Sequence, residues 1–443
     1  MGEKSLSIAQ NSIANEDWSN YYPENPFKLN PEIIYKKAIK PGGILYSEDL
    51  RDALSNVPKQ PTPEERLTYI GYLQRLGITE ACVGVYSGED NKVNDVMKEV
   101  IKAMASNYPD MTPTVLSLTT NASLKWTGEL VQLNPKLKAV VFRGTGNHRM
   151  LVEEWDEEQI LEDFENFIQK TVLQGVGVIA ATEHTTQTTA TFLETIIQKT
   201  IKAGADEFCI ADTIGISDPS GAYNIVSFTK KVLQEMNRAD VMVHWHGHND
   251  MGLAIPNTIA ALMAGADRIH TTAYGIGERA GNVSMEAILL YIHKLLEKSG
   301  YKYPGDISNL WGTLEYYCEI TGVETPSYGP LSANSMRTQL GIHANAIKNA
   351  HLLAEAQTNP HDNELFNKMA QTIYIGYDPS IVGLEPIIEV GPWSGRANVE
   401  LVAKNLGYNT EMLTPKQIQT VLDYAKEKSE VLTDEEIKLL LDG

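Results

Sequence analysis

The fold of this chain is decided by residues 241–252, VMVHWHGHNDMG. The apolar, β-branched start is typical of a buried strand, on which side chains two apart point to the same side. His246 and His248 can therefore both reach one metal ion, and Gly247 between them leaves room. His244 has the same parity but lies one step deeper, in the more apolar part. Three such histidines running into Asn-Asp favour half of a metal site over a buried strand whose histidines only satisfy hydrogen bonds.

Apolar, β-rich runs recur along the chain, with segments of helical periodicity between them. Strand and helix alternate eight times within about 250 residues, which is the pattern of a closed (β/α)8 barrel. A doubly wound open sheet is the alternative, but no glycine-rich dinucleotide turn follows the first run. We therefore predict a TIM barrel. The predicted strands are 43–50, 81–87, 113–118, 137–145, 177–183, 207–214, 241–248 and 268–275. The predicted helices are 62–77, 92–106, 157–173, 188–203, 219–237, 253–265 and 283–298, with 122–134 a weaker case.

Polar side chains are concentrated at the carboxyl ends of the predicted strands. In a TIM barrel these ends meet at one mouth, where catalytic groups gather. Metal ligands, acid/base groups and anion binders at successive strand ends therefore predict an active site. In chain order they are Arg51 and Asp52, Arg143 to His148, Glu183 and His184, Asp212 and Thr213, His246 and His248, and residues 277–282.

Composition narrows the class of protein. The chain has 443 residues, long enough for a barrel and a smaller second unit. Its formal net charge of −20 disfavours nucleic acid and anionic membranes as partners. Cys82, Cys209 and Cys318 are widely spaced and are interpreted as buried apolar residues. Neither a membrane span nor a signal-peptide core is recognisable, so we expect a cytoplasmic enzyme.

The barrel is predicted to comprise residues 41–300. The rest of the chain is predicted to form three further parts. Residues 1–40 are interpreted as an arm that packs on another surface, such as a second subunit. Residues 301–385 and 386–443 are interpreted as small helical subdomains I and II. Aromatic side chains that need an apolar partner in the arm are Trp18, Tyr21, Tyr22 and Phe27.

Two segments at the predicted mouth resemble a known family. Residues 246–254, HGHNDMGLA, and 275–282, GIGERAGN, look like the signature segments of the 2-isopropylmalate, homocitrate and citramalate synthases. The family's strand-one segment appears here as EDLRDA, residues 48–53. The resemblance covers the barrel and most of the remaining chain. Supportive segments of the family's second unit are residues 341–343, 374–379 and 394–396.

This chain departs from the family pattern at two strand ends. Residues 53–55 are Ala-Leu-Ser where the family usually has Gly-Glu-Gln, and 181–184 are Ala-Thr-Glu-His where it usually has Ser-x-Glu-Asp. Arg51, Asp52 and Glu183 are retained, so the departures concern substrate recognition more than the chemistry.

The resemblance implies a reaction and a metal site. The family condenses the methyl carbon of acetyl-CoA with the ketone of a 2-oxo acid and then hydrolyses the thioester. A divalent cation (Mg, Mn or Zn) would be chelated by the 2-oxo acid and would polarise its ketone. Arg51 would stabilise the developing negative charge, with a structural ion pair to Asp52 as the alternative. The implied ligands are Asp52, His246, His248 and, more weakly, Asn282.

The resemblance also implies the groups that move protons and bind substrate. Candidates for removing the methyl proton and activating water are Glu183, His343 and Tyr374. Because His343 and Tyr374 lie outside the barrel, a homodimer is expected in which they act at the partner subunit's mouth. Glu278 would orient the metal ligands or the base. The implied substrate-binding residues are Arg51, Thr213, His148 and Arg143, of which Arg143 could instead face a CoA phosphate or a second carboxylate.

Within the family, the chain most resembles the 2-isopropylmalate synthases. This resemblance implies acetyl-CoA and 3-methyl-2-oxobutanoate as substrates. No strand-rich segment remains for the regulatory domain of leucine-inhibited members, so we expect no leucine inhibition. Citramalate, homocitrate or citrate synthase activity stays open, although a dicarboxylate would need Arg143 as a second cation. The cysteine-bearing loop of 3-hydroxy-3-methylglutaryl-CoA lyase has no counterpart. From another class, a catalytically silent metal-binding barrel acting as scaffold or sensor stays open.

Overall fold

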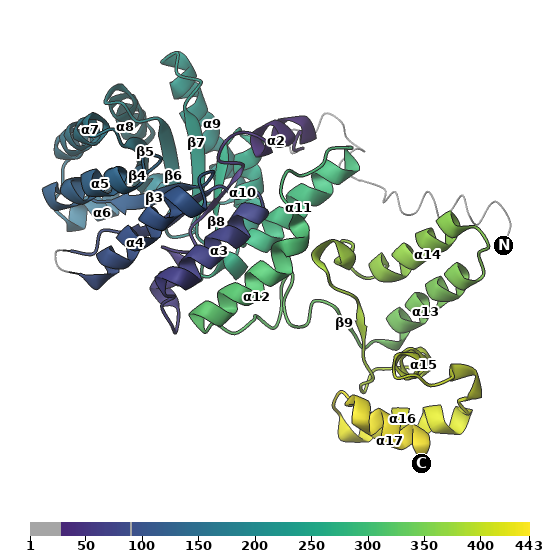
Figure 1. Ribbon diagram of the computed structural model, residues 1–443. Helices are drawn as coiled ribbons and strands as arrows, with labels where there is room; N and C mark the ends of the chain where they lie inside the picture. Colours follow the sequence, from purple (N-terminus) through teal and green to yellow (C-terminus); the bar gives the residue numbers. More distant parts are fainter. Residues whose placement is uncertain (1–27, 89–90) are drawn as a thin grey trace. The chain divides into compact units, whose positions relative to one another are not determined.

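The computed structural model describes residues 28–88 and 91–443, which form two compact units (Figure 1). The first unit ends at Thr325 and the second begins at Pro326. The four aromatic residues of the predicted arm lie outside the described residues. Among the described residues, no helix combines the length and the apolarity that crossing a membrane requires.

The first unit contains a closed barrel of eight strands in the order of the sequence. All neighbouring strands are parallel, and β8 closes the barrel on β1, with Tyr46 paired to His270. The predicted TIM barrel is confirmed. The strands are β1 Leu45–Ser47, β2 Glu80–Val85, β3 Thr112–Ser117, β4 Lys138–Gly144, β5 Gly177–Glu183, β6 Glu207–Asp212, β7 Met242–Gly247 and β8 Arg268–Thr271.

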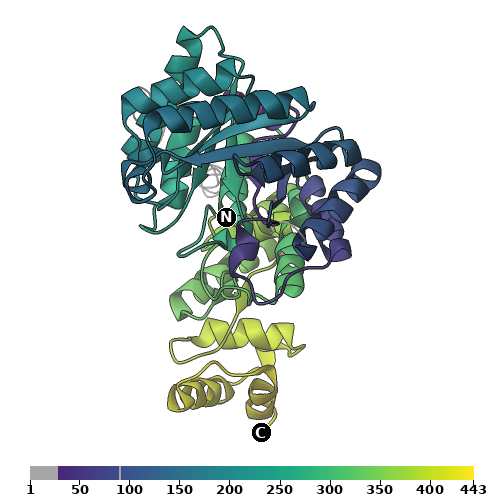
Figure 2. The same cartoon turned by 90° about the vertical axis from the view of Figure 1, so that its left-hand side faces the viewer.

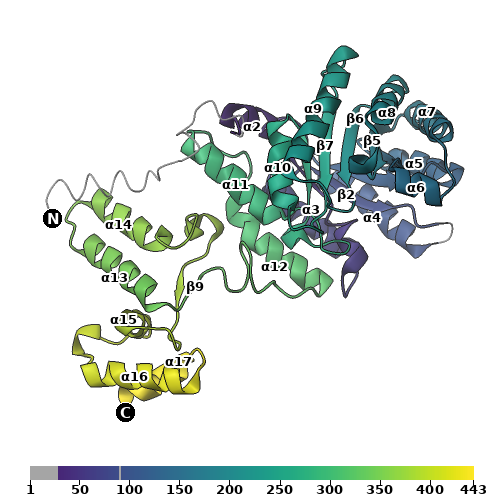
Figure 3. The same ribbon diagram turned by 180° about the vertical axis from the view of Figure 1, so that it is seen from behind.

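Helices form the outer layer of the barrel, as the views from the side and from behind show (Figure 2, Figure 3). Their starts follow local capping rules: Thr62 and Glu65 form a capping box on α3, and Asp218 caps α9 ahead of Pro219. The helices are α2 Pro31–Ala38, α3 Pro63–Arg75, α4 Lys92–Asn107, α5 Asn121–Leu133, α6 Asn147–Val152, α7 Glu157–Leu173, α8 Ala190–Lys202, α9 Pro219–Glu235, α10 Ala254–Met263, α11 Met285–Lys298 and α12 Leu310–Thr321. Short 3-10 turns are η2 Ala53–Asn56, η3 Thr185–Gln187, η4 Ala273–Gly275 and η5 Ile307–Asn309.

The interior of the barrel begins with a charged layer, which we call the base. It consists of the first residues of the four even-numbered strands, because side chains in one layer come from alternate strands. Lys138 Nζ lies 3.1 Å from the Glu80 carboxylate and 2.5 Å from that of Glu207, while Arg268 pairs with Glu80. Further along the axis an apolar cluster is formed by Tyr46, Cys82, Val140, Ile179, Ala181 and Cys209.

The second unit is mainly helical. A left-handed Gly322 (φ +70°) ends α12 before this unit begins. In the second unit, α13 and α14 lie side by side (Figure 1, Figure 3). The elements are β9 Arg337–Thr338, α13 Gly341–Glu355, α14 Pro360–Thr372, η6 Pro379–Val382, β10 Ile387–Ile388, α15 Arg396–Asn405, η7 Thr410–Met412, α16 Pro415–Lys428 and α17 Asp434–Asp442.

Candidate active site

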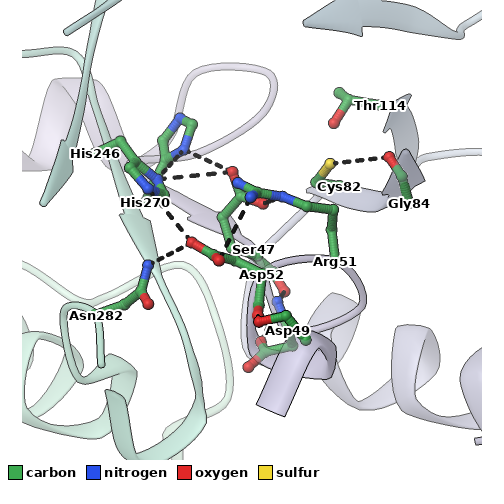
Figure 4. A network of polar contacts seen from close by, with 12 residues as sticks. Ser47, Asp49, Arg51, Asp52, Cys82, Gly84, Thr114, His246, His270 and Asn282 are labelled. Carbon is green, nitrogen blue, oxygen red and sulfur yellow. Dashed lines mark hydrogen bonds and ion pairs between the residues drawn. The ribbon is translucent and has the colours of Figure 1, made fainter. Parts of the chain in front are cut away.

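The structure brings the four predicted metal ligands together at the carboxyl ends of the strands. His246 Nε2 lies 3.2 Å from His248 Nε2 and 3.4 Å from Asp52 Oδ2. The same Asp52 oxygen is 3.8 Å from His248 Nε2 and accepts a hydrogen bond of 2.8 Å from Asn282 Nδ2. Figure 4 shows Asp52, His246 and Asn282 converging from three different strand ends.

This donor set fits a divalent metal ion. Asp52, His246 and His248 are each at least 92 % buried, because their exposed fractions are 4 %, 8 % and 6 %. Asn282 Nδ2 donates to Asp52, and its buried Oδ1 has no hydrogen-bond partner among the described residues. Two imidazoles with carboxylate and amide oxygens are ligands that Zn²⁺ and Mn²⁺ accept. The Oδ1 atom of Asn282 is therefore available to coordinate a cation.

Burial controls the protonation of this cluster. Burial and the neighbouring His248 lower the pKa of His246 to about 3, against the opposing effect of Asp52. Burial also lowers the pKa of His248. Burial alone would raise the pKa of Asp52, but Arg51, the two histidines and Asn282 together hold it below its ordinary value. Near neutral pH the cluster therefore has the neutral imidazoles and the ionised carboxylate that metal binding requires.

Arg51 stands beside the cluster at the end of β1. The chain turns sharply there, since the backbone N–H groups of Arg51, Asp52 and Ala53 all donate to the carbonyl of Glu48. Arg51 Nε donates to Glu48 Oε2 at 2.9 Å, and its Nη1 is 3.5 Å from Asp52 Oδ1. The ion pair with Asp52 is thus present, and Arg51 also lines the central cavity. One guanidinium can serve both the fold and an anionic substrate.

Two expectations about strand seven are wrong. A Cβ at Gly247 would lie 2.9 Å from the indole nitrogen of Trp245, so the missing side chain makes room for Trp245 on the outward face and not for a metal. His244 is not in apolar surroundings either. Its Nε2 is 2.5 Å from Glu207 Oε2, and its Nδ1 is 3.0 Å from His270 Nε2. Alternation along a strand sends position 247 outward, and the charged base surrounds His244.

A cavity of about 250 Å³ opens beside the metal-ligand cluster. One wall is apolar and is formed by Leu116, Val140, Phe142 and Ala181. The remaining walls are polar and include the predicted Glu183, Thr213 and Glu278. Thr213 Oγ1 accepts a hydrogen bond of 2.7 Å from the backbone N–H of His184 and keeps its own proton to donate.

The backbone is strained at two strand ends around this cavity. His184 has φ +58° and Arg279 has φ +56°, in the left-handed region that non-glycine residues rarely adopt. Such strain persists only where surrounding contacts hold it. Arg279 is held by Asp250, at 2.8 and 3.1 Å, and by the carbonyl of Thr213.

The structure places four predicted site residues elsewhere. Arg143 is bonded to Asp163 at 2.8 Å and its guanidinium lies 3.9 Å above the ring of Trp155, so it does not line the cavity. His148 is in α6 and is also absent from the cavity wall. His343 and Tyr374 belong to the second unit, where their rings stack at 3.8 Å. The substrate contacts of the first pair and the catalytic roles of the second stay predictions.

Among the charged and imidazole side chains that line the cavity, Glu48, His270 and Arg279 were given no individual role from the sequence. The position of His270 could have been predicted, because it lies two residues after Arg268 in a predicted strand and therefore points to the same side. Glu48 stood inside the strand-one segment, yet its contact with His270 depends on β1 and β8 closing the barrel.

Comparisons with known proteins agree with this arrangement. A model of the HMGL-like family matches residues 44–311. The 2-isopropylmalate synthase of Sulfurisphaera tokodaii is 32% identical over 52% of this chain and 57% of its own length. The probable 2-isopropylmalate synthase of Ignicoccus hospitalis is 27% identical over 86% of both chains. An HMG-CoA lyase from Acinetobacter baumannii, solved with coenzyme A and 3-methylmalate, has TM-score 0.53 at 17% identity, covering 66% of this chain and 93% of its own. The predicted family resemblance is confirmed, while the solved structure shows likeness of fold alone.

Proposed function

The chain belongs to the HMGL-like family, and from this premise we propose that it is an acyl-CoA condensing enzyme of the 2-isopropylmalate synthase type. The observation that carries the proposal is the convergence of Asp52, His246, His248 and Asn282 beside Arg51, at a cavity with one apolar wall. Acetyl-CoA and 3-methyl-2-oxobutanoate would be its substrates. The names of the relatives support the same reaction class.

The residues of the mouth would divide the work of binding the 2-oxo acid. A divalent ion held by the four ligands would polarise the ketone and favour the alkoxide that forms from it. Arg51 would place a permanent positive charge beside that oxygen, where negative charge develops. Thr213 would donate its hydroxyl proton to the carboxylate of the 2-oxo acid.

Condensation also needs a base, for which Glu183 is the barrel's own candidate. Its carboxylate lines the cavity, and the side chain is 29% exposed, so a substrate can reach it. Glu183 would take the proton from the methyl carbon of acetyl-CoA, and that carbon would form the bond to the ketone carbon. His343 and Tyr374 would assist hydrolysis of the thioester from the partner subunit of a homodimer.

The cavity favours an aliphatic 2-oxo acid. Leu116, Val140 and Phe142 offer no hydrogen bond to a second carboxylate, and burying an unpaired carboxylate is costly. Arg143 cannot compensate from its position, because it does not line the cavity. A second candidate, synthesis from a dicarboxylic 2-oxo acid, rests on Arg279, which lines the cavity and is 41% exposed.

A thiol-trapping assay for CoA release over a panel of 2-oxo acids tests the proposal. We expect 3-methyl-2-oxobutanoate to react best, with 2-oxobutanoate and pyruvate slower, because one methylene changes selectivity by about 1–3 kcal/mol. Preference for 2-oxoglutarate or oxaloacetate, lost in Arg279→Leu, would support the second candidate instead. CoA release with no acid would favour a silent metal-binding barrel. Leucine added to the same assay tests the expected absence of inhibition.

A further inference from the structure

Glu48 connects two groups that the proposed chemistry requires. It follows β1 directly, and its side chain is 3% exposed. Its Oε2 accepts the hydrogen bond from Arg51 Nε at 2.9 Å. Its Oε1 lies 3.0 Å from His270 Nδ1 and 3.8 Å from His246 Nδ1. A single buried carboxylate therefore faces the guanidinium on one side and two imidazoles on the other.

The two ring nitrogens of His246 face different partners. Nε2 faces Asp52 and His248, which makes it the atom available to a metal ion. Nδ1, on the opposite edge of the ring, faces Glu48 and lies 3.3 Å from His270 Nδ1. Among the described residues, no other carboxylate oxygen is within 4.0 Å of this Nδ1. Figure 4 shows His246 and His270 close together, with Asn282 on the side of Asp52.

Donor and acceptor roles follow from this arrangement. A neutral imidazole carries one N–H, and an ionised carboxylate can only accept. Glu48 Oε1 is too far from Nδ1 of His246 for a hydrogen bond, but its negative charge at 3.8 Å favours the proton on Nδ1 and so leaves the lone pair on Nε2. His270 holds the same carboxylate oxygen, with its Nδ1 3.0 Å from Glu48 Oε1. Tyr46 stacks on the His270 ring at 4.0 Å and fixes its orientation.

We propose that Glu48 is a positioning residue, which fixes the metal-binding tautomer of His246 and the orientation of Arg51 through one carboxylate. The proposal rests on the proposed metal-dependent function. Residues that support a metal-ligating histidine in this way typically contribute about 10–100-fold to metal affinity or activity.

The same atoms allow a different assignment, which charge disfavours. Glu48, His246 and His270 offer three ligand atoms within 4.8 Å of one another and could themselves hold a second cation. Arg51, however, already balances the charge of Glu48 at 2.9 Å. A second cation there would be repelled by the guanidinium, at short range and away from water. One metal ion per chain is therefore expected.

The test is a titration of the purified full-length chain with Mn²⁺, followed by electron paramagnetic resonance. The wild type should bind one ion, and E48Q should bind Mn²⁺ about 10–100-fold more weakly. E183Q is the matched control, because it makes the same charge change in the same cavity without touching His246 or Arg51. Its Mn²⁺ affinity should equal that of the wild type. E48D keeps the charge on a shorter side chain and should give an intermediate affinity.

Each outcome decides the proposal. Unchanged affinity in folded E48Q, as judged by circular dichroism, would overturn it. Two ions in the wild type, one of them lost in E48Q, would overturn it as well by making Glu48 a ligand. If E48Q does not fold, E48D carries the test, and wild-type affinity in E48D counts against the proposal. The titration needs no turnover, so absent CoA release would defeat the proposed reaction and leave this inference standing.

Discussion

The base and the mouth of the barrel are both polar, but only the base balances its own charges. At the base, Glu80 and Glu207 share Lys138, and Arg268 pairs with Glu80. Burial would raise the pKa of Glu207, but its contacts with His244 and Lys138 lower it to about 2. Each acid at the base has a cation beside it, so the layer has a structural role.

The mouth is built differently. His246 and His248 turn their Nε2 atoms toward each other at 3.2 Å, and within the described part of the chain Asn282 Oδ1 has no hydrogen-bond partner. Buried acceptor atoms that face one another have no hydrogen-bond donor between them. Leaving such atoms unsatisfied lowers the stability of the folded chain, and a bound cation would remove this penalty. A structural layer and a site therefore differ in the partners of their polar groups, rather than in polarity or burial.

Behind the mouth lie two buried acids, neither of which is paired with a cation from residues 28–88 or 91–443. Asp49 is bonded to Ser47 and to the backbone N–H of Ala273, and Glu286 to the backbone N–H of Tyr274. Burial raises the pKa of Asp49 to about 6 and that of Glu286 to about 7. These acids therefore respond to pH in the opposite sense from Glu207.

The largest effect is expected from His248→Ala. Removing a ligand should abolish binding of the divalent ion and CoA release, a greater loss than the ~10–100-fold typical of a supporting residue. Ion content can be measured by mass spectrometry after gel filtration. His244→Ala is the control, since His244 contacts Glu207 of the base and not the metal-ligand cluster, so the variant should keep the ion. If His244→Ala loses the ion and His248→Ala retains it, then His244 and not His248 is the metal ligand.

The next effect concerns stability at the base. Arg268→Met leaves Glu80 buried with one cation fewer and should lower the free energy of unfolding by about 3–5 kcal/mol. Urea denaturation measures this loss, and Mn²⁺ affinity should stay the same. The exposed Arg238, paired with Asp240, supplies a matched control, because Arg238→Met should cost only about 0–1 kcal/mol. Equal costs for the two variants would show that the base is not structural.

A third effect concerns how stability depends on pH, which differs between Glu286 behind the mouth and Glu207 at the base. The folded pKa of Glu286 is about 7 against an ordinary 4.5, so the folded chain binds more protons than the unfolded chain between these values. Its stability therefore falls as pH rises through this window, by on the order of 3 kcal/mol at 1.36 kcal/mol per unit. Glu207 has the opposite sign: its contribution is present above pH 4.5 and is lost as pH falls toward 2.

Glu286→Gln tests the sign directly. Glutamine can still accept from Tyr274 N–H and donate to Ser284, and it has no charge to bury. In urea unfolding the variant should be more stable than the wild type at pH 8 and similar to it at pH 4.5. A variant less stable than the wild type at pH 8 would contradict the raised pKa.

The smallest effect is expected just outside the mouth. Arg143→Leu should leave turnover of 3-methyl-2-oxobutanoate within about tenfold, a change of about 1.4 kcal/mol or less, because the guanidinium contacts Asp163 and Trp155 and not the cavity. Steady-state kinetics gives the ratio. A loss of more than tenfold that is confined to kcat would show that Arg143 takes part in the reaction.

The elements could be predicted where a local pattern suffices. The predicted strand 177–183 and helix 157–173 coincide with β5 and α7, because periodicity and capping are read over a few residues. Strand one was predicted over 43–50, yet β1 ends at Ser47. The apolar pattern continues there, while the backbone turns to place three N–H groups on the Glu48 carbonyl.

The order of strands and helices and the shared face of His246 and His248 could be predicted from the sequence. Both follow from parity and periodicity, which are properties of neighbouring residues. The contacts of Glu48 and His270 with His246, and the turn of Arg143 away from the cavity, arise only in the folded barrel. These contacts join residues from different strands. Which side chains meet across the interior depends on the stagger at which eight strands close, and no local pattern contains it.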